Sequence, residues 1–417
     1  MRYALLFTLF IACASPVSAL ADDGLVTLQE LEQEALRNNP EIRMVEKRAE
    51  SADEKRSLAS ALPDPMIGYM VQNEGSPFQW TVGGEKTPMS MQGVVFSQEV
   101  PFPGKLSTMG KVAEKRAERE HESARETKYR ILANLRSAYY EYYLAYRSAD
   151  ILNETKDLMK NFQRIAETRY TTGQGTQQDV LRSQLEVSML LDRLAEEERK
   201  KESQAAMINS LTGRDPMAPL GRPAELPLVT LTKSADEIAS MVNAHSPALS
   251  GKQLMVEQGE FEVSSSKKEF LPDMVVSGGW FFRGQLPDVW QASVMFKVPL
   301  YFWNKSTGVR AANAELSSAR YDLEAAKLMV MARVRDLYSA AKTSEHHVHL
   351  YETGIIPQAR LALQSATSNY QVGRTDFLGL LDSESLLLKY QLMEQEELVN
   401  LHKTLAMIGE MTGEEHQ

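Results

Sequence analysis

The two halves of this sequence repeat one arrangement of short motifs. Tyr170-Thr-Thr-Gly173 recurs as Tyr370-Gln-Val-Gly373, 200 residues later, and Leu211-Thr-Gly213 recurs as Met411-Thr-Gly413 at the same offset. Earlier matches are Asn39-Pro40 with Ser246-Pro247, Leu62-Pro63-Asp64 with Leu271-Pro272-Asp273, and Val100-Pro101 with Val298-Pro299. A repeat of this length means one structural unit copied in tandem, so the fold has to be interpreted for each half.

The repeat sets the domain boundaries that we expect. They are a signal peptide at 1–21, a first repeat at 22–213 with a hairpin at 64–102 and a long helix pair at 104–213, a connector at 214–233, and a second repeat at 234–417 with a hairpin at 273–302 and a long helix pair at 304–413. Four prolines lie in the connector, which argues against regular structure there.

The first residues have the pattern of a secretory signal. Arg2 gives the positive charge, a short apolar run follows, and Ala19-Leu20-Ala21 offers a small-x-small cleavage site. Cys13, the one cysteine of the chain, lies inside this segment, so the mature chain should carry no disulfide. A lipoprotein cleavage site at Cys13 stays open as an alternative. No later apolar run reaches the roughly 18 residues of a transmembrane helix.

The composition limits the possible functions. The 417-residue chain has a formal net charge of −10 with 24% charged residues, which argues against a nucleic-acid partner. The sequence has no phosphate-binding glycine loop, no HExxH motif and no serine elbow, so we expect no enzymatic activity and no cofactor.

Very long helices follow from the distribution of glycine and proline. Neither residue occurs between Lys111 and Tyr170, and apolar residues recur there at spacings of three and four. A helix from Gly104 to Tyr170 would be about 100 Å long at 1.5 Å per residue. A turn at Gly173 and a returning helix at 177–212 should follow, and the second half should repeat this pair. Gly354-Ile-Ile-Pro357 should kink the second long helix.

Each half also predicts one β-hairpin. The expected strands are 66–72, 92–100, 274–282 and 291–298. Ala292, Val294 and Phe296 alternate with Gln291 and Ser293, which fits a membrane barrel with a wet interior or an ordinary half-buried sheet. Four strands cannot close a barrel, and lipid does not tolerate an open sheet edge. A secreted chain of this kind should therefore oligomerise around an axis.

These motifs together resemble the TolC family of outer-membrane efflux proteins. The resemblance rests on Asn39-Pro40, the Leu62-Pro-Asp-Pro65 run, the Gln98-to-Lys105 run with Pro-Phe-Pro-Gly, and the two Tyr-x-x-Gly tips, and it covers essentially the whole mature chain. The Leu-Pro-Asp-Pro and Pro-Phe-Pro-Gly-Lys runs look most like the heavy-metal-efflux branch, the CzcC-like proteins.

The resemblance implies a mainly α-helical fold with a β-barrel part. Three copies would form a twelve-stranded outer-membrane barrel above a long periplasmic tube of coiled-coil helices. The family works as the exit duct of tripartite efflux pumps, with a periplasmic adaptor and an inner-membrane transporter of the RND type as partners. Heavy-metal cations, other small solutes, or the peptides and proteins of type I secretion could be the cargo.

The resemblance also implies candidate sites at the two helical tips. Tyr170, Gly173, Tyr370 and Gly373 would contact the adaptor, and as simple helix caps they need no partner. Asp382 occupies a position where the family often places an acid that constricts the pore, and three copies would form a ring of carboxylates. The companion acid three residues earlier is Gly379 here, and Asp179 of the first repeat could replace it. The alternative for these acids is a solvated helix face.

Two rival functions stay open at this point. One is a periplasmic coiled coil without a pore, which the alternating hairpins argue against. The other is a metal-dependent enzyme that uses His346, His347 and His349, the only histidine cluster. Histidines at 346 and 349 share a helix face, but they lack carboxylate support, so we predict no metal site.

Overall fold

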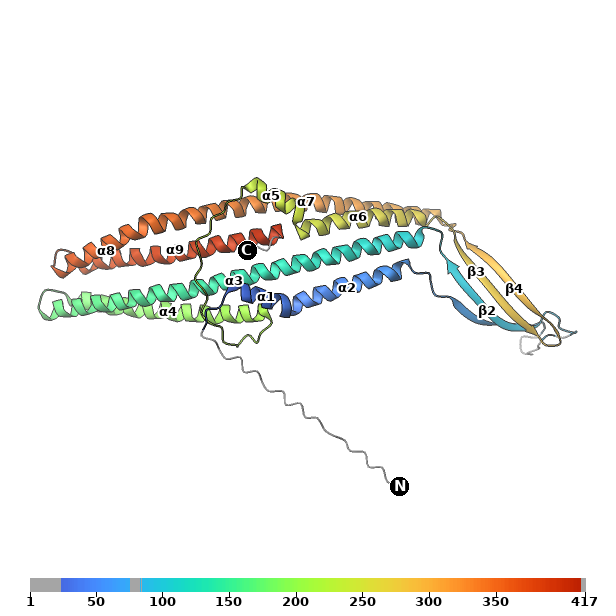
Figure 1. Cartoon of the computed structure of the whole chain (residues 1–417), viewed down its shortest axis with the longest axis horizontal. Helices are drawn as coiled ribbons and strands as arrows, with labels where there is room; N and C mark the ends of the chain where they lie inside the picture. The colour runs from blue at the N-terminus through green and yellow to red at the C-terminus, as the bar shows by residue number, and fades with distance from the viewer. Residues whose placement is uncertain (1–23, 76–82, 84, 414–417) are drawn as a thin grey trace, which may run out of the picture.

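The computed structural model describes residues 24–75, 83 and 85–413, which form an elongated molecule. A β-sheet lies at one end, and two helical hairpins end together at the other (Figure 1). The predicted signal peptide at 1–21, including Cys13, lies outside the described residues. Within those residues, no helix has the length and apolar character that crossing a bilayer requires.

Two short helices open the first half. Thr27 and Glu30 form a reciprocal capping box at the start of α1 (Leu28–Asn38). Asn39 ends this helix and caps α2 (Pro40–Ser60), because its Oδ1 accepts hydrogen bonds from the N–H groups of Glu41 and Ile42. The predicted helix break at Asn39-Pro40 is therefore confirmed.

The rest of the first half follows the expected order. The strands β1 (Met66–Gln72) and β2 (Met91–Val100) precede α3 (Lys105–Thr171), and α4 (Gln177–Thr212) returns alongside α3. With 67 residues, α3 is about 100 Å long. Gly213 ends α4 in the left-handed region at φ +79°.

The second half repeats these elements. It contains α5 (Ala235–His245), α6 (Pro247–Lys268), β3 (Asp273–Arg283), β4 (Leu286–Lys297), α7 (Phe302–Leu350), the π-helical turn η1 (Tyr351–Ile355), α8 (Ile356–Gln371) and α9 (Phe377–Thr412). The predicted duplication of the fold is thus confirmed.

Two features of the second half differ from the expectation. The strand β4 begins at Leu286, five residues before the predicted start, because Pro287 is tolerated on a strand that forms the edge of the sheet. At the predicted kink, the chain forms the π-helical turn η1 and then continues as α8. Pro357 cannot donate a helical hydrogen bond, and the widened turn accommodates that interruption without ending the helix.

The four strands form one antiparallel sheet in the order β1-β2-β3-β4. Tyr69, Val94, Trp280 and Trp290 are cross-strand neighbours in one row, and all four side chains are exposed. Ser97, Ser277 and Ser293 lie in a row of the opposite face. The sheet therefore has one exposed apolar and aromatic face. The opposite face is mixed, with serine, glycine and charged side chains beside methionines and the buried Phe281.

The helices next to the sheet form a single layer in which α2 contacts α3, α3 contacts α6, and α6 contacts α7. Toward the other end, α3 pairs with α4 and α8 pairs with α9 (Figure 1). An apolar seam joins these two hairpins, with Met159 and Phe162 of α3 packed in one buried cluster with Leu363 of α8 and Leu380 of α9. The long helices are thus stabilised by burial along their length.

Candidate functional site at the hairpin tips and the groove

Both tips are tight turns that need glycine. Gly173 and Gly373 have φ angles of +72° and +74°, a region in which a side chain is strained. In the first tip, the N–H of Gln174 donates to the carbonyl of Arg169 at 2.8 Å, and in the second, Arg374 donates to Asn369 at 2.9 Å. The capping part of the prediction is therefore confirmed for both glycines.

The residue Arg169 connects the two tips. Its guanidinium donates hydrogen bonds to the backbone carbonyl of Tyr370 and, at 3.1 Å, to that of Gln174. It also lies 4.7 Å from the centroid of the Tyr370 ring, a cation–π distance. One side chain of the first hairpin thus contacts both the backbone and the ring of the second. The sequence analysis missed Arg169. Its signal was a difference between the repeats, because the equivalent position of the second half is Asn369.

The two tip tyrosines have different environments. Tyr170 is 47% exposed, whereas Tyr370 is 2% exposed and packs on Phe377 at a ring distance of 5.4 Å. The Tyr370 hydroxyl is buried without a hydrogen-bond partner among the described residues. Burial raises the pKa of this hydroxyl, and the negative charge of Asp179 raises it further. Tyr170 is therefore the tyrosine that a partner protein can reach.

The two predicted constriction acids lie on different hairpins. Asp179 is in the first turn of α4 and is half-buried, whereas Asp382 is exposed on α9. At Gly379, an added Cβ would meet the Thr375 methyl at 3.0 Å and the capping carboxylate of Asp376 at 3.3 Å. An acid at position 379 would therefore crowd the cap of α9. The pore role of Asp179 and Asp382 stays a prediction.

A buried acid lies two residues beyond Asp382. Glu384 is 6% exposed, and its Oε1 has no hydrogen-bond partner among the described residues. Its pKa is raised to about 7, mainly by burial and also by the negative charge of Glu186 of α4, while the positive charge of Arg193 lowers it. Phe377, Leu381, Glu384 and Leu388 are spaced by four, three and four residues, so Glu384 occupies a seam position of a heptad pattern. That pattern was the signal that sequence analysis overlooked.

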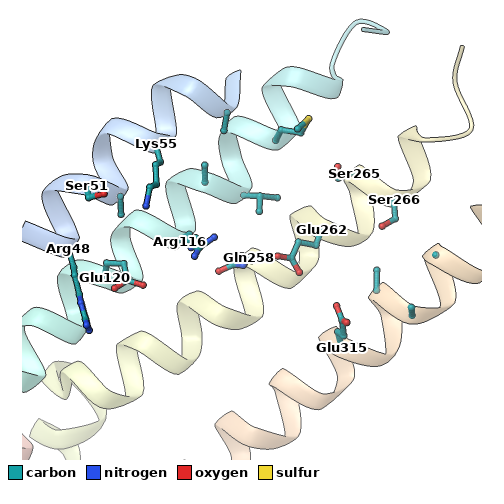
Figure 2. A pocket seen from close by; sticks show the side chains of 18 of the residues that line it. Arg48, Ser51, Lys55, Arg116, Glu120, Gln258, Glu262, Ser265, Ser266 and Glu315 are labelled. Carbon is teal, nitrogen blue, oxygen red and sulfur yellow. Dashed lines mark hydrogen bonds between the residues drawn. The ribbon is translucent and has the colours of Figure 1, made fainter. Parts of the chain in front are cut away.

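The single helix layer contains a groove of about 1010 Å³ (Figure 2). Arg48 and Lys55 of α2 line one side, and Glu262 of α6 and Glu315 of α7 line the other. Its apolar lining includes methionine and alanine side chains, namely Met44, Ala52, Ala59, Met109, Ala113, Ala311 and Ala312. The groove can therefore contact a solute with both charged and apolar groups.

The histidine cluster is only partly buried. His346 and His349 are exposed, and the half-buried His347 ring stacks on Tyr351 at 5.8 Å. Its Nδ1 lies 3.7 Å from the Glu397 carboxylate. In the part of the chain that the structure describes, no group of three or more histidine, cysteine or acidic side chains is arranged to hold a metal ion.

The fold is that of solved outer-membrane channels. The Vibrio cholerae outer membrane protein VceC is 18% identical with a TM-score of 0.79, over 93% of this chain and 96% of VceC. The Campylobacter jejuni channel CmeC is 14% identical with a TM-score of 0.80, over 93% and 85%. The channel CusC is 16% identical with a TM-score of 0.79, over 92% and 91%. No curated protein matches the sequence.

The family model for outer membrane efflux proteins matches residues 31–214 and 238–414. Because these two matches cover most of the chain, the protein belongs to the outer membrane efflux protein family, whose TolC-like fold it has. It is accordingly an efflux channel of the outer membrane and not an enzyme. The two separate matches also correspond to the two copies of the repeat.

Proposed function

We propose that three copies of this chain form the exit duct of a tripartite efflux pump. The sheet carries this proposal, because its apolar face suits lipid while β1 and β4 have no strand beyond them among the described residues. Three four-stranded sheets would give a barrel of twelve strands, with the helices as a periplasmic tube. The domain boundaries and the signal peptide at 1–21 are part of this proposal.

The number of copies and the pore are tested separately. Native mass measurement in detergent should give a trimer, and a stable monomer would contradict the closed barrel. The trimer should conduct ions in planar bilayers, whereas a coiled coil without a pore would not.

The proposed partners are a periplasmic adaptor, which would contact the tips at Tyr170, Gly173, Tyr370 and Gly373, and an inner-membrane RND-type transporter. The exposed side chain of Tyr170 supports adaptor contact at the first tip. Site-specific photocrosslinking from position 170 in cells that contain the pump tests this. A crosslink to the adaptor is expected, and a crosslink only to other copies of this chain would contradict it.

For the cargo, we propose small solutes, with heavy-metal cations as the first candidate. The CzcC-like motifs Leu-Pro-Asp-Pro and Pro-Phe-Pro-Gly-Lys support this candidate, and the acids Asp179 and Asp382 at the tube entrance would favour cations. Deletion of the gene should lower the tolerated concentration of a transported cation. Unchanged metal tolerance together with increased sensitivity to organic compounds would assign the channel to organic solutes.

A further inference from the structure

The sheet ends in two edges that differ in their sequence but are related by the internal repeat. Every residue of β1 is exposed, and so is most of β4. Neither strand has a further neighbour within residues 24–75, 83 and 85–413. Unpaired edges present a row of backbone N–H and C=O groups that another strand can satisfy.

The two hairpins of the sheet correspond residue by residue. Sequence matching relates β1 to β3 by 209 residues (Asp64 to Asp273) and β2 to β4 by 198 residues (Val100 to Val298). With these two offsets, the observed pair Met66–Ser97 of the first hairpin becomes Val275–Met295, which is a pair in the second hairpin. The same offsets therefore reproduce the register of one hairpin from the other.

The junction between the two hairpins within one chain is the template for the junction between two copies. The strands β2 and β3 pair antiparallel, with Val95 opposite Gly279 and Phe96 opposite Gly278. Adding 198 residues to each β2 position and subtracting 209 from each β3 position turns this junction into one between β4 and β1. Within one chain these strands are separated by β2 and β3, so the β1 must come from another copy.

We propose the register of the seam at which β4 of one copy meets β1 of the next in the proposed barrel: antiparallel, with Ser293 opposite Met70 and Val294 opposite Tyr69. This inference rests on the proposed trimer and adds the residue-level register of its strand seam. Each copy would then use both of its edges, and the ring would contain two kinds of equivalent seam.

The two faces of the sheet agree with this register. It places Phe296 opposite Ile67 and Val294 opposite Tyr69, which continues the exposed apolar face across the seam. It places Ser293 opposite Met70 and Gln291 opposite Gln72 on the other face. A slip of one residue would join the apolar face to the opposite one, so the register is strongly specified.

The hydrogen bond that Asp273 accepts at the base of the sheet supports the same correspondence. Asp273 accepts hydrogen bonds from the Phe102 N–H at 2.9 Å and from the Lys105 ammonium at 2.8 Å, and the Lys105 side chain is nearly buried. The matching acid Asp64 is exposed and has no hydrogen-bond or ion-pair partner within the described residues. With the same offset of 198, Asp64 of one copy would accept a hydrogen bond from the Leu300 N–H of its neighbour, as Asp273 does from Phe102. The position that matches Lys105 is Trp303, and Lys305, two residues further on, is paired with Glu269 of its own chain.

Disulfide crosslinking in native membranes tests the register. In a chain that carries both Met70→Cys and Ser293→Cys, the cysteine at position 70 of one copy should form a disulfide with the cysteine at position 293 of the next under mild oxidation. Tyr69→Cys with Val294→Cys tests the adjacent pair, because neighbouring pairs of an antiparallel ladder alternate between hydrogen-bonded and non-hydrogen-bonded geometry. Matched controls are Met70→Cys with Gln291→Cys or with Met295→Cys, which are slipped by two residues, roughly 7 Å along the strand. That slip exceeds the reach of a disulfide. The wild-type chain and single-cysteine variants report any contribution of Cys13.

The products separate this inference from the proposed function. Covalent trimers from the designed pairs, at least about tenfold more abundant than from the slipped pairs, are the expected result. Covalent dimers as the final product would support the strand seam but contradict the three-copy duct. A trimer by native mass that crosslinks only through a slipped pair would overturn the register, as would a trimer that crosslinks through none of the pairs.

Discussion

We expect the buried carboxyl of Glu384 to make the tip end of the helical tube less stable as pH rises. Its pKa is raised from the ordinary value of 4.5 to about 7, because burial disfavours the charged form and Glu186 is close. An acid with a raised folded-state pKa stabilises the packed state fully below its unfolded pKa, and this contribution is lost as pH rises through 7. The relevant window is therefore about pH 4.5 to 7.

The magnitude follows from the two pKa values. With values of 4.5 and about 7, proton linkage between pH 5 and pH 8 amounts to about 2.5 kcal/mol, or about 70-fold in the local opening equilibrium. Residual hydration of the carboxylate makes this an upper limit. Glu384→Gln keeps the size of the side chain and removes its ionisation, so the variant should lose this pH dependence.

Hydrogen exchange of peptides from the tip ends of α4, α8 and α9 measures the effect. Comparing wild type with Glu384→Gln at each pH cancels the intrinsic pH dependence of amide exchange. The protection ratio of the two proteins should change up to about 70-fold between pH 5 and 8. Asp192→Asn, which removes an exposed acid of α4, is the control. The ratio of wild-type protection to Asp192→Asn protection should not change with pH. A ratio that is constant with pH would refute an ionising Glu384 in the seam.

Three further predictions concern the tips. Gly173→Val and Gly373→Val should each destabilise the tip by about 1–2 kcal/mol from the left-handed backbone alone, and should abolish efflux while membrane insertion persists. Because a Cβ at Gly373 would also meet the Arg169 guanidinium at 3.2 Å, the Gly373→Val variant should show the larger loss of hydrogen-exchange protection at the tip. Efflux that survives both changes would contradict a role of the tips in function. Arg169→Ala should lower the free energy of local opening of the second hairpin, measured by hydrogen exchange, by about 1.5–3 kcal/mol. Arg169→Lys should restore little of this, because lysine cannot donate to two carbonyls as a planar fork. Equal protection in wild type and both variants would contradict the link that Arg169 makes between the tips. Asp382→Ala should weaken block by trivalent or divalent cations and reduce cation preference in planar bilayers, with a smaller change for Asp179→Ala, and unchanged block would leave Asp382 as a solvated helix-face acid.

The helices and their ends could be predicted because their signals are local. Asn39-Pro40, Gly173 and Gly373 fix breaks and turns through backbone geometry that depends on few neighbours. The start of β4 could not be predicted from residues alone, because whether Pro287 is allowed depends on the strand being at the sheet edge.

The contacts of the candidate site needed the third dimension. Arg169 and Tyr370 are 201 residues apart in the sequence, and only the packing of one hairpin on the other brings them together. For Glu384, the heptad spacing within α9 was available, but its burial depends on which helix covers that face. Sequence periodicity defines a stripe, and only the fold identifies what the stripe contacts.

The two ends of the molecule preserve the repeat to different degrees. At the sheet, the halves keep the same register and the same acid at the strand start, as a ring of equivalent seams requires. At the tips they differ, since Tyr170 is exposed where Tyr370 is buried, and Arg182 stands where the second half has Asp382. A charge reversal at matching positions would serve no purpose if both hairpins met the same surroundings. We therefore infer that the α3–α4 and α8–α9 hairpins have different tasks at the tips, because the second hairpin has Asp382 and the buried Glu384 where the first has Arg182 and Gln184.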